Sequence, residues 1–211
     1  MTARSTAALG AGLVIAGACL IMFAFRGSPA GSGGTALPSD VTTTIPAAGT
    51  GQRGGQPAPL ARSVPVGIRI PAIGVAAPVV GLGLNADGSV QVPPLADHNL
   101  AGWYEYGPTP GQRGASVILG HVDSSTGPSV FFRLKDLRKG QLIVVSLADG
   151  RQAAFTVDGV QAAPKDHFPT NAVYGQVLYQ GLRLITCGGP FNPSTGHYLD
   201  NVIVYAQRRG A

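Results

Sequence analysis

The sequence predicts an all-β domain that forms a closed or nearly closed antiparallel barrel. Short segments rich in β-branched residues recur about every ten residues in the second part of the chain, and few runs have helical periodicity. Glycine (31) and proline (17) are abundant among the 211 residues, which favours turns over long helices. Many short strands with frequent turns are typical of a barrel.

The expected strands follow from alternating apolar residues and from the turns between them. Residues 64–70 alternate and contain Pro65, which favours an edge strand. Residues 141–147 and 151–160 flank a turn at 148–150 and predict a hairpin. The other expected elements are strands at 75–80, 115–120, 181–186 and 201–206, two short strands within 82–92, and one helical turn within 131–137.

Residues 1–26 predict a membrane anchor. Residues 5–25 carry no charge and have an arginine on each side, and about 20 apolar residues are what a helix needs to cross a bilayer. We expect an uncleaved helix with the rest of the chain outside the cell; the alternative is a signal peptide that is cleaved near Ala30. Cys19 lies in this span, and Ala16 three positions before it does not favour lipid attachment.

Residues 27–62 predict a flexible linker, and residues 63–211 predict one folded domain. The linker is rich in glycine and proline and has almost no apolar periodicity, so it cannot bury enough surface to fold. The net charge of +5 comes from scattered basic residues without a Lys/Arg block. We therefore expect a protein that works near an anionic surface and does not bind nucleic acid.

Cys187 is the first candidate for chemistry. It is the one cysteine of residues 63–211, at the end of the strand expected at 181–186, and two glycines follow it. A single cysteine in an exported domain indicates a reactive thiol; the alternative is a buried, inert one. Because glycines let a ligand backbone approach closely, we expect Ile185 and Gly188 to contact a bound peptide.

His121 is the expected partner of this thiol. It follows the buried strand at 115–120, which also ends in glycine. Two strands that end at the same rim would bring imidazole and thiol together, and a nucleophilic thiol needs such a base. His197 is a weaker candidate, whereas His98 and His167 lie in polar loops and are expected to have no chemical role.

Four segments, in their order and spacing, resemble the motifs of the sortase family, and the match looks closest to the actinobacterial class F sortases. The resemblance covers residues 63–211, and the expected anchor and linker also suit the family. The segments are Gly120-His121 after a strand, the FxxL segment Phe131–Leu134, the strand end Leu184-Ile185-Thr186-Cys187, and the last strand at 201–206.

The resemblance implies an eight-stranded β-barrel cysteine transpeptidase with no cofactor and no metal. Such an enzyme cleaves an LPXTG-like sorting signal at the C-terminus of an exported protein. Cys187 would attack the threonine carbonyl to form a thioester, and His121 would act as general acid and base. The acceptor amine would belong to a peptidoglycan precursor or to a pilin. The implied location is the cell membrane, with a single span and the catalytic domain facing the cell wall.

The family's third catalytic residue is an arginine that holds the substrate and stabilises the oxyanion. It usually lies at the start of the last strand, where this chain has Leu199 and Asp200. Arg183 shares the strand and the face of Cys187 but lies ~13 Å away along it. Arg133 follows His121 and is the alternative. We expect Arg183 to take this role, with Arg133 as the second choice.

Two other functions share features with this sequence. An L,D-transpeptidase also uses a thiol on cell-wall peptides, but its SHGC-like motif is missing from this chain. A catalytically inactive sortase-like domain, serving as an anchored binding or assembly module, is favoured by the missing arginine. The cysteine and histidine spacing predicts no zinc site, and there is neither an EF-hand spacing nor a Gly-rich phosphate loop.

Overall fold

The structure is a computed structural model that describes residues 57–209. The expected anchor (1–26) and most of the expected linker (27–62) lie outside this range. Within it, no helix is long and apolar enough to cross a membrane. Residues 57–62 lie against the barrel: the Leu60 amide donates to Gly111 O at 2.9 Å, and the Leu60 side chain packs on the core. The folded part of the chain thus begins before Ser63.

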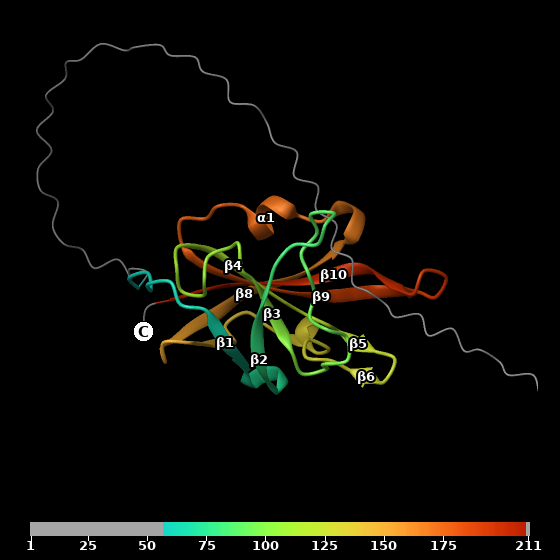
Figure 1. Ribbon diagram of the computed structural model, residues 1–211, viewed down its shortest axis with the longest axis horizontal. Helices are drawn as coiled ribbons and strands as arrows, with labels where there is room; N and C mark the ends of the chain where they lie inside the picture. The colour runs from blue at the N-terminus through green and yellow to red at the C-terminus, as the bar shows by residue number, and fades with distance from the viewer. Residues whose placement is uncertain (1–56, 210–211) are drawn as a thin grey trace, which may run out of the picture.

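Within the described residues, eight strands form a closed barrel, and two short strands form a separate hairpin (Figure 1). The strands are β1 (Pro65–Ile70), β2 (Val75–Leu82), β3 (Ala101–Tyr104), β4 (Gly114–Gly120), β5 (Asp123–Ser124), β6 (Gly127–Pro128), β7 (Leu142–Leu147), β8 (Gln152–Pro164), β9 (Gln180–Asn192) and β10 (His197–Gln207). The helical segments are η1 (Pro71–Ile73), η2 (Leu134–Asp136), η3 (Lys165–His167) and α1 (Thr170–Tyr174). The order around the barrel is β1-β2-β3-β4-β9-β10-β8-β7, and β7 pairs with β1. The predicted closed barrel is confirmed.

The prediction that the barrel is antiparallel is wrong for two pairs of neighbouring strands. β2 pairs with β3, and β4 pairs with β9, in the parallel direction. Parallel neighbours need a long connection between them, and both pairs have one. The β4–β9 pair matters most here, because two parallel strands end on the same side of a sheet.

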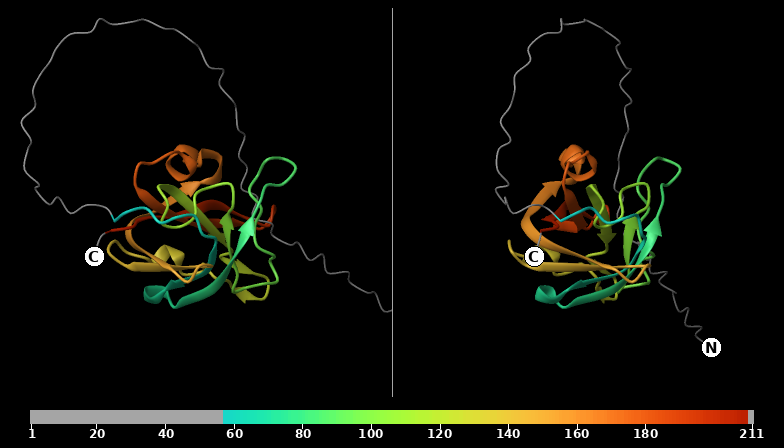
Figure 2. Two further views of the ribbon diagram at one scale, coloured as in Figure 1. Left: turned by 60° about the vertical axis from the view of Figure 1, so that its left-hand side comes forward. Right: turned by 90° about the vertical axis from the view of Figure 1, so that its left-hand side faces the viewer.

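Two hydrophobic clusters distinguish the inside of the barrel from a covered outer face. The larger cluster contains Trp103 and Leu184 and draws on strands all around the barrel. The smaller one contains Leu119 and Ile185, together with Val173 of α1. Because adjacent strand residues point to opposite faces, the smaller cluster lies on the outer face of β4 and β9. Figure 2 shows the segment that carries α1 lying over this side of the barrel.

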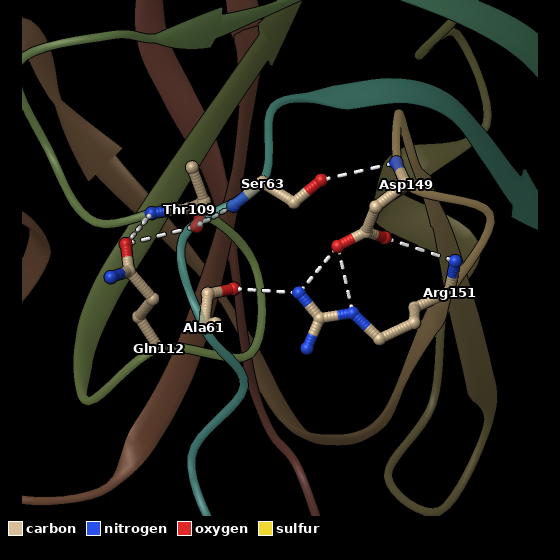
Figure 3. A network of polar contacts seen from close by, with 6 residues as sticks. All are labelled: Ala61, Ser63, Thr109, Gln112, Asp149 and Arg151. Atoms are coloured by element: carbon tan, nitrogen blue, oxygen red, sulfur yellow. Dashed lines mark hydrogen bonds and ion pairs between the residues drawn. The ribbon is translucent and has the colours of Figure 1, made fainter.

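A polar network holds the start of the domain to the β7–β8 turn (Figure 3). Arg151 donates to the Asp149 carboxylate from Nε (2.8 Å) and Nη2 (2.5 Å), and Nη2 also donates to Ala61 O (3.0 Å). The Asp149 amide donates to Ser63 Oγ at 3.2 Å. On the other side, the Ser63 amide donates to Thr109 Oγ1, also at 3.2 Å. These contacts attach the chain ahead of β1 to two loops that are distant in sequence.

This network predicts an acid-sensitive contribution to stability. Hydrogen bonds from Arg151 lower the pKa of Asp149 from 3.8 to about 2. A lowered folded-state pKa contributes stability above pH about 4, and this contribution is lost as the pH falls toward 2. Thermal melts should show Asp149→Asn less stable than wild type at pH 6 by a small amount, since the site is exposed. The difference should be much smaller at pH 2, where about half of the folded-state carboxylate is protonated; an equal difference at both pH values would contradict this assignment.

Candidate functional site

His121 stands directly after the last residue of β4 and is held by the segment ahead of η2. The Phe131 amide donates to His121 O at 3.0 Å. A Cβ on Gly120 would come within 2.6 Å of atoms of both Val130 and Phe131. The glycine before the histidine therefore allows this segment to pack closely, and that packing fixes the backbone of His121.

The imidazole of His121 is buried and is oriented by the loop between β2 and β3. His121 is 6% exposed, and its Nε2 lies 2.7 Å from Pro93 O. A carbonyl oxygen can only accept a hydrogen bond, so Nε2 carries the proton. In the neutral ring the lone pair is then on Nδ1, which is the nitrogen available to take up a proton.

Cys187 lies on β9 beside the end of β4. The parallel register pairs Leu119 with Ile185, and continuing it by two residues brings His121 next to Cys187. Neighbouring strands lie ~4.8 Å apart, so this continued register gives the two residues adjacent backbone positions on one face of the sheet. The expectation that both strands end at one rim is wrong for β9: β4 ends at Gly120, but β9 continues past Cys187 to Asn192, paired with β10.

Cys187 is buried, with 6% of its surface exposed. The thiolate is the nucleophilic form of cysteine. Nucleophilic chemistry at this position therefore requires the reduced form of Cys187.

The two glycines after Cys187 are explained by packing within the β9–β10 pair. A Cβ on Gly188 would approach Val202 Cγ2 to 2.7 Å. Gly189 has φ +73°, a conformation that favours glycine. It lies where the β9–β10 register shifts, between the pairs of Tyr198 and Asp200. A contact of Gly188 with a peptide, expected from the sequence, stays a prediction.

A small pocket lies between His121 and the part of β9 that precedes Cys187. The empty space in this hollow, open solvent included, is about 220 Å³. The β2–β3 loop forms one wall, and the end of β4 and the middle of β9 form the others. Its lining includes Val92, Pro93, Leu119, His121, Ile185 and Thr186. The expected substrate-binding residue Ile185 is therefore part of a concave surface beside the imidazole.

Arg183 is buried under α1, and its guanidinium points away from Cys187. It donates to Ala172 O (3.1 Å), to Leu182 O (3.1 Å) and to Tyr179 Oη (2.8 Å). Its Nη1 lies 3.2 Å from the position a Cβ on Gly181 would take, which is toward the start of β9. The guanidinium carbon also lies 4.8 Å from the centre of the Tyr205 ring. These contacts favour a structural role, and the catalytic role expected from the sequence stays a prediction.

Arg133 and His197, the second choices of the sequence analysis, lie at the surface. Arg133 Nε is 3.4 Å from Asp136 Oδ2, and its side chain is 57% exposed. It follows Phe131, so it belongs to the segment that packs on His121. His197 pairs with Asn192 near the tip of the β9–β10 hairpin, which projects beyond the barrel (Figure 1).

A tyrosine–carboxylate contact links the histidine segment to this hairpin, and the sequence analysis did not identify it. The Tyr198 hydroxyl donates to Asp123 Oδ2 at 2.5 Å. This hydrogen bond raises the pKa of Tyr198 to about 12. Asp123 stands two residues after His121, so the contact helps to hold β4 and β10 in position on either side of β9. Only the pairing of distant segments reveals it.

His98 has hydroxyl partners and no acidic one in the described structure. Thr126 Oγ1 lies 2.8 Å from its Nε2, and Ser129 Oγ lies 3.3 Å from its Nδ1. These contacts hold the β2–β3 loop, which also carries Pro93, to the β5–β6 hairpin. Among residues 57–209, no three His, Cys, Asp or Glu side chains come together as a metal site would require.

The chain is similar to known proteins, both in sequence and in fold. The sortase domain family model matches residues 68–209. Similar solved structures include sortase A from Corynebacterium diphtheriae (19% identity, TM-score 0.54), where the match covers 72% of this chain and 63% of that one. This chain thus spans somewhat less than two thirds of that relative.

Two further solved structures are similar at comparable levels. Sortase C-1 from Actinomyces oris has 23% identity and a TM-score of 0.52, with 69% of this chain and 73% of that one covered. A Clostridium perfringens sortase D5 transpeptidase has 22% identity and a TM-score of 0.51, with 70% and 79% covered. A comparison with curated proteins finds no match. At these identities the structural likeness shows the fold, but the family model covers more than half of the chain, and the chain therefore belongs to the sortase family.

Proposed function

We propose that this protein is a cysteine transpeptidase in which Cys187 is the nucleophile and His121 the general acid and base. The observation that supports the proposal is the parallel β4–β9 register, which pairs Leu119 with Ile185, the residues two positions before His121 and Cys187. Membership of the sortase family supports the same reaction.

The proposed reaction has two acyl-transfer steps. The reduced Cys187 sulfur attacks the threonine carbonyl carbon of an LPXTG-like signal, the carbon–nitrogen bond to the next residue breaks, and His121 gives a proton to the leaving amine. An acceptor amine then attacks the thioester and gives its proton to His121, while the carbon–sulfur bond breaks and Cys187 leaves as thiolate. The products are one new amide bond and the regenerated enzyme.

The partners and location of the enzyme follow from the same proposal. The donor is an exported protein with a C-terminal sorting signal, and the acceptor is an amine of a peptidoglycan precursor or a pilin. The uncharged residues 5–25 support anchoring in the cell membrane. The similar solved structures are sortases A, C and D5, and the motifs around His121 and Cys187 are the support for placing this chain in class F.

The test is intact-mass detection of the thioester. The full chain with Cys19→Ser, which leaves Cys187 as its one cysteine, is reduced and incubated with a panel of LPXTG-type peptides, with and without an amine. We expect a mass increase equal to the acyl fragment, which the amine removes as an aminolysis product. The matched control is the same chain with Cys187→Ala, which should give no adduct.

Each negative result has a distinct meaning. If no peptide forms an adduct while a small thiol reagent labels Cys187, the transpeptidase proposal fails and the inactive binding module becomes the better explanation. An adduct that survives in Cys187→Ala would place the nucleophile elsewhere.

A further inference from the structure

The outer face of the barrel is ordered in rows that run across β4, β9 and β10. In the first row, Arg183 of β9 is paired with Val117 on one side and with Tyr205 on the other. The guanidinium lies over the Tyr205 ring, so residues paired in register do meet on this face. The second row consists of Leu119, Ile185 and Ile203, which belong to one buried cluster.

The third row contains the candidate catalytic pair and one more polar residue. Cys187 is paired with Asn201 of β10, and the β4–β9 register continued by two residues adds His121 on the other side. Directly opposite residues on neighbouring antiparallel strands have Cβ atoms ~5 Å apart. The row therefore reads histidine, cysteine, asparagine, with the cysteine in the middle.

Asn201 is buried with an unsatisfied oxygen. The residue is 2% exposed, and its Oδ1 has no hydrogen-bond partner among the described residues. A buried acceptor without a hydrogen bond lowers the stability of the fold by about 1–3 kcal/mol. Such groups are rare in native structures, and each one needs a physical explanation. A bound ligand that donates the missing hydrogen bond would explain this oxygen. Because Asn201 is paired with Cys187, such a ligand would lie beside the cysteine.

The position of Cys187 between Asn201 and His121 determines which group the side-chain amide of Asn201 can contact. Cys187 separates Asn201 from His121, and His121 is already oriented by Pro93 O. Asn201 is therefore placed to contact the group that bonds to the sulfur, and not to orient the imidazole. It follows Leu199 and Asp200, the positions at which the resemblance leads one to expect the missing arginine.

We infer that Asn201 binds the substrate backbone at the scissile bond, an inference that rests on the proposed function. Its Nδ2 donates to the carbonyl oxygen that becomes the oxyanion when the Cys187 sulfur attacks, and its Oδ1 accepts a backbone N–H of the peptide. An amide presents one donor and one acceptor side by side, as an extended peptide does. A donor that bonds an oxyanion acts mainly in the transition state.

The test compares acylation by the reduced full chain, carrying Cys19→Ser, with the LPXTG-type peptide that labels wild type. Asn201→Ala is expected to lower the acylation rate at saturating peptide by about 10²–10³-fold, with a much smaller change in KM. Asn201→Asp keeps the shape but brings a negative charge to the oxyanion, and should be slower still. Labelling of Cys187 by a small thiol reagent should be unchanged in both.

The matched control is Ser116→Ala. Ser116 is also buried, and its Oγ also lacks a partner among the described residues, but it belongs to no row containing Cys187. It should acylate at the wild-type rate. Acylation by folded Asn201→Ala within about threefold of wild type would overturn the inference and leave the proposed function standing. If wild type itself forms no adduct, the proposed function fails first, and this inference with it.

Discussion

Replacing His121 with glutamine is expected to lower the rate of thioester formation by about 10²–10⁴-fold, which is the usual contribution of general acid–base catalysis. Glutamine retains an N–H that can donate to Pro93 O, as His121 Nε2 does at 2.7 Å. It has no group that can carry a proton to the leaving amine. Single-turnover acylation, followed by intact mass on the reduced chain, measures the effect.

The control for this substitution is His98→Gln. His98 holds the same loop that carries Pro93, through hydroxyl groups on the β5–β6 hairpin and near it. It should retain acylation within about threefold of wild type. If both variants lost the same fraction of activity, the β2–β3 loop and not the imidazole of His121 would be responsible. If His121→Gln acylated as fast as wild type, the base would lie elsewhere.

The sequence predicts the strands whose pattern is local and does not predict how they pair. The alternation in 141–147 and 151–160 and the turn between them predicted β7 and β8 correctly. β3 was missed, because Trp103 and Tyr104 lie among turn residues and their segment is short. The parallel β4–β9 pair was also missed, since alternation reports the buried face of a strand but not the direction of its neighbour.

The candidate site was predictable only in part: β4 ends just before His121 as expected, whereas β9 continues past Cys187 to Asn192. Gly120-His121 and the single cysteine of the domain are visible as local patterns, and the structure puts them on adjacent strands. Asn201 has no such pattern: it is one polar residue at the start of an expected strand. Its position opposite Cys187 comes from the β9–β10 register, including the shift near Gly189, and a register shift between distant strands cannot be read from either strand alone.

Replacing Arg183 with methionine is expected to lower the free energy of unfolding by about 3 kcal/mol, because buried acceptors lose their donor. Arg183 is 2% exposed and donates to two backbone carbonyls, one of them Ala172 O in α1. Methionine has a similar length and fills irregular gaps, so the loss reports the hydrogen bonds more than a cavity. Chemical denaturation of the variant and wild type measures it.

The same variant separates a structural arginine from a catalytic one. If Arg183 acts only by holding α1 to β9, acylation per folded molecule should fall by less than about tenfold while stability drops. Arg69→Met is the control: Arg69 is an exposed arginine on β1, and its loss should change stability by no more than about 0.5 kcal/mol. The opposite result, unchanged stability with acylation reduced more than about 10²-fold, would assign Arg183 to the oxyanion. It would also require the guanidinium to leave Tyr205 and turn toward Cys187 when the peptide binds.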